Sequence, residues 1–158
     1  MSESSNRPFF VYGTLLPGQP NYYVWGQAVV SEEQAVLANG RLYDLGHYPM
    51  LIEIGDRQVK GMLVDVAESE YAAVLARLDY LEGYDLTQFA TCAYRRVRRK
   101  ISGVSGCVRT AWVYIGRPQY VVGKPAISGG DWLAYVGATA KESRRWWANV
   151  KSVSGLLD

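Results

Sequence analysis

The chain has 158 residues, of which 49% are hydrophobic and 20% are charged, and its formal net charge is +2. This composition is typical of a globular protein and excludes a disordered chain. The length predicts one domain, residues 1–158, whose ends at 1–7 and 152–158 we expect to be flexible. So small a net charge does not indicate a polyanionic partner.

No apolar run approaches the roughly 18 residues that a membrane-spanning helix needs, so no membrane partner is expected. The polar start Met1–Asn6 has neither the basic nor the apolar part of a secretory signal, and we expect a cytoplasmic protein. The chain has two cysteines, Cys92 and Cys107, and one histidine, His47. Without Cys-x-x-Cys spacing they argue against a zinc site, and both cysteines are expected to be buried free thiols, with a single disulfide as the alternative.

The first predicted strand, residues 8–13, contains four consecutive apolar residues at Phe9–Tyr12 and should be buried on both faces. It ends at Gly13, which is followed by Thr14 and by a loop of turn-forming residues at 16–21. Because a glycine has no Cβ, backbone N–H groups at this turn can approach a ligand closely. The segment therefore predicts the start of an anion-binding pocket.

Strand character recurs along the chain, and glycines separate the segments as turns or bulges. The further predicted strands cover residues 34–45, 49–54, 58–66, 92–101 and 108–116. One clear helix lies between them and a second follows them, without regular alternation of strands and helices. This order predicts an α+β fold with a mixed, barrel-like or strongly curved sheet rather than a doubly wound sheet.

The clear helix is predicted from apolar residues at i, i+3, i+4 and i+7 spacing, which form one buried face. These residues are Tyr71, Val74, Leu75, Leu78 and Leu81. Gly83 should end the helix, which places Glu82 beside the buried face and at the negative end of the helix dipole. Both effects raise the pKa of a carboxyl group and suit it to proton transfer near neutral pH. The alternative is an ordinary, partly exposed glutamate, and Asp79 and Asp85 are competing carboxylates.

A basic run follows in the next predicted strand, where five of the six residues from Arg95 to Lys100 are basic. In a strand, Arg96 and Arg98 share one face with Lys100, opposite to Arg95 and Arg99. The run is typical of an edge strand whose charges prevent sheet-to-sheet association. It is also compatible with nucleic-acid contact, or with one arginine turned inward to bind an acidic substrate.

The last part of the chain predicts a second helix, over about residues 130–150. Ser128, with Asp131 three residues later, resembles a capping box at its start. The cluster Arg144-Arg145-Trp146-Trp147 predicts that this helix docks its two indoles and leaves its arginines in water.

Motifs of several enzyme classes are missing. The chain has no Gly-x-Ser-x-Gly elbow, which argues against a serine hydrolase. It has no Gly-x-Gly-x-x-Gly or Walker pattern, which argues against a nucleotide enzyme. His47, isolated in a predicted turn, is interpreted as a structural or surface histidine.

Several short motifs nevertheless occur in a recognisable order. The first strand ends in Tyr12-Gly13-Thr14-Leu15, and the clear helix ends in Leu78-Asp79-Tyr80-Leu81-Glu82-Gly83-Tyr84. Between them lie Tyr48-Pro49 and a strand glycine, Gly61, and after them come Tyr94-Arg95-Arg96 and Val113-Tyr114. With these motifs, over roughly residues 9–135, the chain resembles the γ-glutamylcyclotransferase-like (AIG2-like) family.

The resemblance implies a small mixed β-barrel with flanking helices and a cavity at one end. It implies that the turn at residues 12–15 binds the α-carboxylate and α-amine end of a γ-glutamyl group, and that Glu82 is the catalytic acid/base. The implied reaction is a cyclisation, in which the α-amine attacks the side-chain amide of the same glutamyl group, forms 5-oxoproline and releases an amine. Since the nucleophile belongs to the substrate, no metal or cofactor is expected.

We therefore expect an enzyme, a γ-glutamyl cyclotransferase or lyase with Glu82 as its catalytic residue. The expected substrate-binding residues are Tyr12, Gly13, Thr14, Leu15, Tyr114 and Arg95, with Arg96 as the alternative to Arg95. Tyr12 and Tyr114 are expected to line the pocket and to donate hydrogen bonds. One alternative is a non-catalytic member that binds a small molecule or a peptide in the same cavity. The other is a nucleic-acid-binding protein that uses the strand at 95–100, which the small net charge ranks last.

Overall fold

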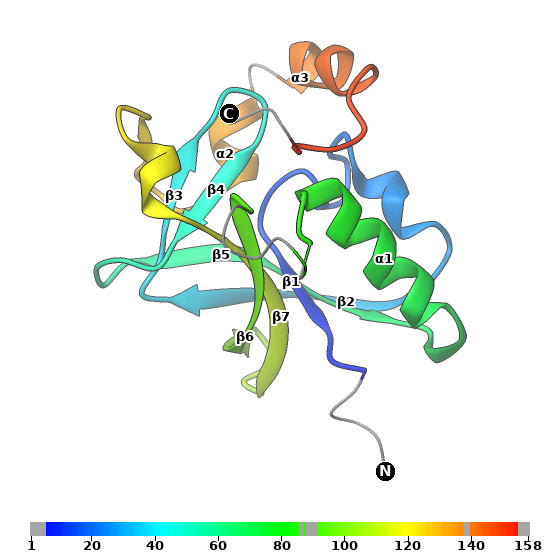
Figure 1. Ribbon diagram of the computed structural model, residues 1–158. Coiled ribbons are helices and arrows are strands. Elements are labelled where there is room, and N and C mark those ends of the chain that lie inside the picture. Colours follow the sequence, from blue (N-terminus) through cyan, green and yellow to red (C-terminus); the bar gives the residue numbers. More distant parts are fainter. Residues whose placement is uncertain (1–5, 86, 88–91, 138–139, 155–158) are drawn as a thin grey trace.

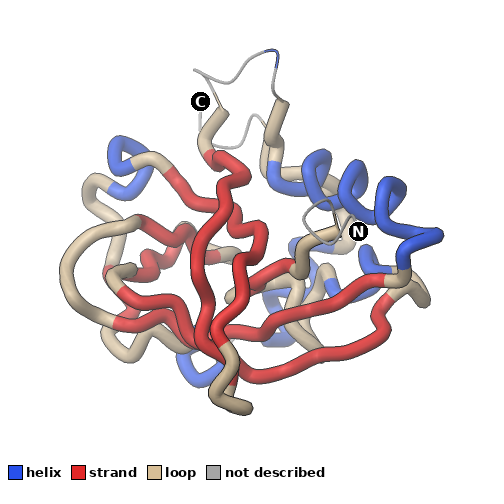
Figure 2. Tube along the Cα trace, turned by 90° about the horizontal axis from the view of Figure 1, so that it is seen from below, coloured by secondary structure: helices blue, strands red, loops and turns tan. Residues whose placement is uncertain are grey.

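A closed five-stranded barrel forms the centre of the molecule (Figures 1 and 2). The computed structural model describes residues 6–85, 87, 92–137 and 140–154, without the side chains of 140–143. The barrel strands, in spatial order, are β1 (Phe9–Val11), β5 (Gln58–Val66), β2 (Val29–Ala38), β6 (Tyr94–Gly103) and β7 (Val108–Gly116). All neighbours are antiparallel except β1 and β7, which run parallel. The predicted mixed barrel of an α+β fold is thus confirmed.

A second, three-stranded sheet lies beside the barrel in the order β4-β3-β8. Its strands are β3 (Arg41–Asp44), β4 (Pro49–Ile52) and β8 (Ala126–Ile127). The single strand expected at 34–45 is therefore wrong, because the chain leaves the barrel after β2 and enters the other sheet as β3. Asn39 has a φ of 63°, a left-handed conformation that turns the chain between the two strands.

The predicted central helix is confirmed as α1 (Tyr71–Glu82), which packs on the barrel core. Tyr71, Val74, Leu78 and Leu81 are buried, as the apolar spacing predicts. The helix ends at Gly83, whose φ of 69° is left-handed. Glu82 is thus the last residue of α1. In the described part of the chain, short 3-10 helices also connect other elements: η2 (Tyr22–Trp25), η3 (Glu68–Glu70) and η5 (Pro118–Val121).

The single helix expected over about 130–150 is wrong, because the chain forms two shorter helices, α2 (Trp132–Val136) and α3 (Ala140–Trp147). Trp132 is buried in one core cluster and Trp147 in the other, and the break lets the chain reach both. Asp131 is itself the N-cap of α2 and accepts a hydrogen bond from the Ala134 N–H, so the expected capping box with Ser128 does not form.

The basic strand β6 pairs with β7 along its length but with β2 only at Ser102 and Gly103. Its basic stretch therefore has one neighbouring strand, as an edge strand does. Two of its charges are paired: Arg96 with Asp79, and Arg99 with Glu53. These ion pairs reduce the positive charge that the strand presents to a polyanion.

Both cysteines are free, as expected, but only Cys92 is buried. Cys107 is exposed, because it lies in the turn between β6 and β7 rather than in a core strand. Among the described helices, none combines the length and the apolar character needed to cross a membrane. The expected flexible ends fall partly outside the described residues, but Val153 is described and is buried.

Candidate active site

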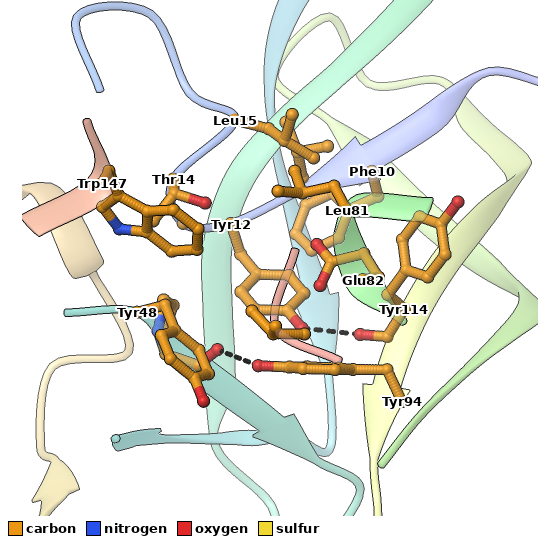
Figure 3. A pocket seen from close by; sticks show the side chains of 14 residues that line it. Phe10, Tyr12, Thr14, Leu15, Tyr48, Leu81, Glu82, Tyr94, Tyr114 and Trp147 are labelled. Carbon is orange, nitrogen blue, oxygen red and sulfur yellow. Dashed lines mark hydrogen bonds between the residues drawn. The ribbon is translucent and has the colours of Figure 1, made fainter. Parts of the chain in front are cut away.

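A small cavity lies where β1 ends, between β4 and the last turn of α1 (Figure 3). Its volume is about 20 Å³, which is room for roughly one water molecule. The lining residues are 10–15, Tyr48, Pro49, Leu81, Glu82, Tyr94, Tyr114, Trp147 and Val153. Most of this wall is apolar or aromatic, and Glu82 is the one carboxyl group among its described residues. The cavity thus brings together Glu82, the turn at 12–15 and Tyr114, which the sequence assigned to one site.

The pKa of Glu82 is raised from 4.5 to about 8, first by burial and second by the negative charge of Asp79. Burial removes water that would solvate the carboxylate, and a nearby like charge disfavours it further. The side chain lies near those of Leu81 and Tyr114 in the cavity (Figure 3). A carboxyl group with this pKa exchanges protons readily near neutral pH.

The turn at Gly13, Thr14 and Leu15 is buried and lines the cavity. Among the described residues, none accepts a hydrogen bond from the N–H groups of these three residues. The carbonyl groups of the same turn are paired: Gly13 accepts from the Leu16 N–H at 3.0 Å, and Thr14 accepts from the Asn21 N–H at 2.9 Å. Buried N–H groups without a partner are rare in proteins, and consecutive ones form a concave site for an anion.

Asn21 and Pro49 fix the position of this turn. Asn21, itself buried, donates its side-chain N–H to the Thr14 hydroxyl oxygen at 3.1 Å, which leaves the Thr14 proton free to point elsewhere. Pro49 packs so closely that a Cβ added at Gly13 would lie 2.5 Å from the Pro49 Cγ. Glycine is therefore required at position 13 by close approach.

Three tyrosines of the cavity donate hydrogen bonds from their phenol O–H groups to oxygen atoms of the protein. Tyr12 donates to the Tyr114 carbonyl at 2.6 Å, Tyr94 to the Pro49 carbonyl at 2.7 Å, and Tyr114 to the Asp79 carboxylate at 2.6 Å. Burial raises the pKa of each of the three phenols, so they stay protonated. The phenol protons of Tyr12 and Tyr114 are thus engaged within the protein in this arrangement, and a hydrogen bond from either residue to a ligand stays a prediction. Their oxygens keep lone pairs that can accept hydrogen bonds, for example from an ammonium group.

Asp79 lies one turn before Glu82 on α1 and outside the cavity. It accepts two hydrogen bonds from Arg96, at 2.9 and 3.3 Å, in addition to the one from Tyr114. The Arg96 guanidinium is also 4.4 Å from the centre of the Trp112 ring. Asp79 is therefore held in place by three hydrogen bonds from two residues, close enough for its charge to act on Glu82.

The structure does not bring Arg95 or Arg96 into the cavity lining. Arg96 turns to Asp79, and the Arg95 Nε is buried with no hydrogen-bond partner among the described residues. Arg95 lies on the other face of β6, where its charge helps to lower the pKa of Glu53. Asp85, the other competing carboxylate, is exposed and accepts hydrogen bonds from Thr87.

Several residues of the cavity are absent from the sequence-based site. Tyr48, Pro49 and Tyr94 belong to the motifs of the family resemblance, and those motifs are the signal that points to them. Trp147 is predicted only as a docked indole, and Val153 falls in an end expected to be flexible. Nothing in the sequence links the last two to a turn more than 130 residues earlier. Within the described part of the chain, no three His, Cys, Asp or Glu side chains are close enough to hold a metal ion.

Residues 9–134 match the family described as "Gamma-glutamyl cyclotransferase, AIG2-like". The chain belongs to this family. It is 32% identical over 127 residues to a protein of Vibrio cholerae whose own assignment as a gamma-glutamylcyclotransferase is provisional. That alignment covers 80% of this chain and 96% of the relative. Family membership and this relative support γ-glutamylcyclotransferase-like activity, and the chain is an enzyme of the cyclotransferase type.

Solved structures with similar folds include YkqA from Bacillus subtilis, with a TM-score of 0.59 and 24% identity. That match covers 83% of this chain but only 41% of YkqA, which is a longer protein. An AIG2-like protein from Mus musculus has a TM-score of 0.55 and 24% identity, with coverage of 73% of this chain and 82% of the mouse protein. At these identities the two structures support the fold.

Proposed function

We propose that the protein is a cofactor-independent cyclotransferase that converts a γ-glutamyl amide into 5-oxoproline and a free amine. One observation carries this proposal: a single cavity contains both a carboxyl group of raised pKa and three consecutive unpaired N–H groups. Glu82 supplies the first, and the turn at 13–15 supplies the second. A carboxyl group that can transfer protons and a turn that can bind an anion lie in the same cavity. This combination suits a substrate that carries a carboxylate and whose own amine attacks its side-chain amide.

The α-carboxylate of the substrate would bind to the N–H groups of Gly13, Thr14 and Leu15. Among the residues that the structure describes, no lysine or arginine side chain lines the cavity, so the backbone provides the positive end of this interaction. The α-ammonium group would donate hydrogen bonds to Glu82 and to the phenol oxygens of Tyr12 and Tyr114, whose own protons are already used. The two ends of the amino-acid head group thus meet complementary groups.

In the reaction, the Glu82 carboxylate accepts a proton from the α-ammonium group of the substrate. The free amine then attacks the side-chain amide carbon, the new ring C–N bond forms, and the bond to the leaving nitrogen breaks. Glu82, now a carboxylic acid, donates its proton to the leaving nitrogen as that bond breaks. Its carboxylate then takes the second proton from the ring nitrogen and passes it to the released amine, which leaves 5-oxoproline, an ammonium ion and the regenerated carboxylate. Because the pKa of Glu82, about 8, lies near neutrality, one group can both accept and donate these protons.

Intramolecular attack needs little more from the protein than correct orientation. Well-oriented intramolecular reactions reach effective molarities of about 10⁵–10⁸ M, so a folded substrate conformation accounts for much of the acceleration. The aromatic wall excludes water, and the cradle at 13–15 holds the end of the substrate that must curl back. This division explains why no serine or cysteine nucleophile is required in the cavity.

The test is a mass-spectrometric screen for 5-oxoproline release from γ-glutamyl amides of amino acids, lysine side chains, polyamines and simple alkylamines. Glu82→Gln keeps the shape of the side chain but cannot transfer a proton, and we expect it to lower turnover by about 10²–10⁴-fold. Asp85→Asn is the matched control, because it removes an exposed carboxylate three residues away and should leave turnover unchanged. Unchanged turnover in Glu82→Gln would overturn the proposed role. Binding of these amides without 5-oxoproline release would favour the non-catalytic alternative.

A further inference from the structure

The cavity is too small for the proposed substrate. At about 20 Å³ it holds one water molecule, whereas a γ-glutamyl amide has about ten non-hydrogen atoms. Most of the wall is rigidly held. Residues 10–15, Tyr94 and Tyr114 belong to the closed barrel or follow directly from it, and Glu82 ends a helix packed on the barrel. Part of the wall has to move before a substrate can enter.

The wall that is not part of this framework is the 140–154 segment, which comprises α3 and the residues after it. It contributes Trp147 and Val153, whose exposed fractions are only 4% and 5%. No strand pairing joins the described part of this segment to either sheet. It also lies beyond residue 134, where the match to the family ends. In Figure 1 it crosses above the end of α1.

The 140–154 segment is held by single hydrogen bonds to main-chain carbonyls at the rim of the cavity. The Trp147 indole N–H donates to the His47 carbonyl at 2.8 Å, and the Val153 N–H donates to the Leu81 carbonyl at 2.9 Å. The Ser152 hydroxyl adds a bond to the Tyr80 carbonyl at 2.6 Å. Each such bond contributes about 1 kcal/mol net, and the burial of Trp147 and Val153 in the core cluster adds to them. The segment is therefore attached by side-chain packing and single hydrogen bonds, without the strand pairing that closes the barrel.

Aromatic stacking completes the attachment. The Trp146 ring stacks on His47, with 4.8 Å between ring centres, and more loosely on Tyr48 at 6.2 Å. Trp147 contacts Tyr48 edge-on at 5.9 Å. Both residues before Pro49 are therefore covered by this segment, so a movement of the segment uncovers the cavity from the side of β4.

We propose that the 140–154 segment is a mobile cap, which opens to admit the substrate and then closes over it, and that Trp147 is a specificity-determining residue. The ligand named here rests on the proposed function, whereas the closure rests on the geometry alone. With the cap closed, Trp147 and Val153 fill space that the substrate must occupy or lie against. The indole therefore limits the size of the γ-glutamyl amide that the closed site can accept.

A disulfide between the cap and α1 tests the movement. A Cβ added at Gly83 would lie 3.4 Å from the Ser154 Cβ, close to the separation found in disulfides. Gly83→Cys with Ser154→Cys, in a Cys107→Ser background that removes the exposed thiol, should lock the cap shut when oxidised. We expect kcat/KM to fall at least tenfold on oxidation and to recover with dithiothreitol. Gly83→Cys alone, treated identically, controls for the left-handed backbone at this position.

Hydrogen exchange gives a second readout that needs no substrate. The N–H groups of Gly13, Thr14 and Leu15 are buried but not hydrogen-bonded, so their protection depends on how often the cavity opens. Locking the cap should slow their exchange several-fold relative to the reduced protein. Equal exchange in the oxidised and reduced forms would overturn the cap, whatever the enzyme acts on.

Replacement of Trp147 tests the specificity. Trp147→Ala should raise kcat/KM for bulky γ-glutamyl amides at least tenfold relative to small ones, and Trp147→Phe should restore part of the preference. Arg145→Ala, an exposed neighbour on α3, should leave the ratio unchanged. An unchanged ratio in Trp147→Ala would refute the specificity role. If no variant releases 5-oxoproline, the proposed function fails, and hydrogen exchange still decides the cap.

Discussion

Two regions meet at the cavity and differ in how they are held. The turn at 12–15 follows a central barrel strand, is buried, and is fixed by hydrogen bonds from Leu16 and Asn21. The 140–154 segment lies beyond the family match and is attached by hydrogen bonds, ring contacts and the burial of Trp147 and Val153, without strand pairing. The comparison suggests two separate roles. The barrel and α1 hold the groups proposed to react, and the added segment is proposed to control access of the substrate to the cavity. Such a segment can change without disturbing the groups that react.

The largest effect should follow from changing the turn. In Gly13→Ala the new Cβ would lie 2.5 Å from the Pro49 Cγ, so the turn must shift. Such a shift misorients the bound substrate for attack by its own amine. We expect kcat/KM to fall by about 100-fold, equally for small and bulky amides, in steady-state assays. Gly129→Ala is the control, because a Cβ there has nothing within 4 Å. A loss confined to bulky amides would contradict the separation of the two regions.

A large effect on stability is expected at Glu82, with a size that depends on pH. Its pKa in the folded protein, about 8, is higher than the ordinary value of 4.5, so folding favours the protonated form. The stability that the protonated Glu82 side chain contributes is fully present below pH 4.5 and is lost as the pH rises to about 8. Glu82→Gln, which does not ionise, should therefore gain stability over the native chain across this window, on the order of 2 kcal/mol. Denaturant unfolding at several pH values measures the difference.

A smaller change is expected when Asp79 is neutralised. Because the proposed base must be ionised, kcat/KM should rise with pH through about 8 in the native enzyme. Asp79→Asn removes the negative charge that helps to raise the pKa of Glu82, so the rising limb should move to lower pH. The shift should be partial, since burial contributes more than Asp79. A pH–rate profile with an unchanged midpoint would show that this charge does not act on the catalytic group.

The smallest effect should come from loosening the cap. Ser152→Ala removes the hydrogen bond to the Tyr80 carbonyl, which is worth about 1 kcal/mol. We expect the amides at 13–15 to exchange a few-fold faster, with the free energy of global unfolding changed by no more than that amount. Ser128→Ala, an exposed serine away from the cap, should change neither. If the amides at 13–15 exchange only through global unfolding in both Ser152→Ala and Ser128→Ala, the cap does not open separately from the rest of the protein.

The expected site and the observed cavity agree where local patterns carried the information. Apolar spacing along α1 and the glycine after it placed Glu82 at a helix end beside the core, and both features depend on neighbours within one turn. The glycine and hydroxyl after β1 likewise marked a turn with open amides. The direction of an arginine on β6 could not be inferred in this way, because it depends on which carboxylates the finished barrel brings to each face. Asp79 lies near one face and Glu53 near the other.

The sequence by itself determined the strand-ending turn, the helix end with its carboxyl group and, through the order of short motifs, the family. Each of these follows from steric and hydrogen-bonding preferences of residues adjacent in the chain. Only the tertiary structure decided that Tyr12 and Tyr114 donate their phenol protons to groups of the protein, that Asp79 is held by Arg96, and that Trp147 lines the cavity. These contacts join residues 17 to more than 130 positions apart. They exist only once the barrel has closed and the last segment has docked on it.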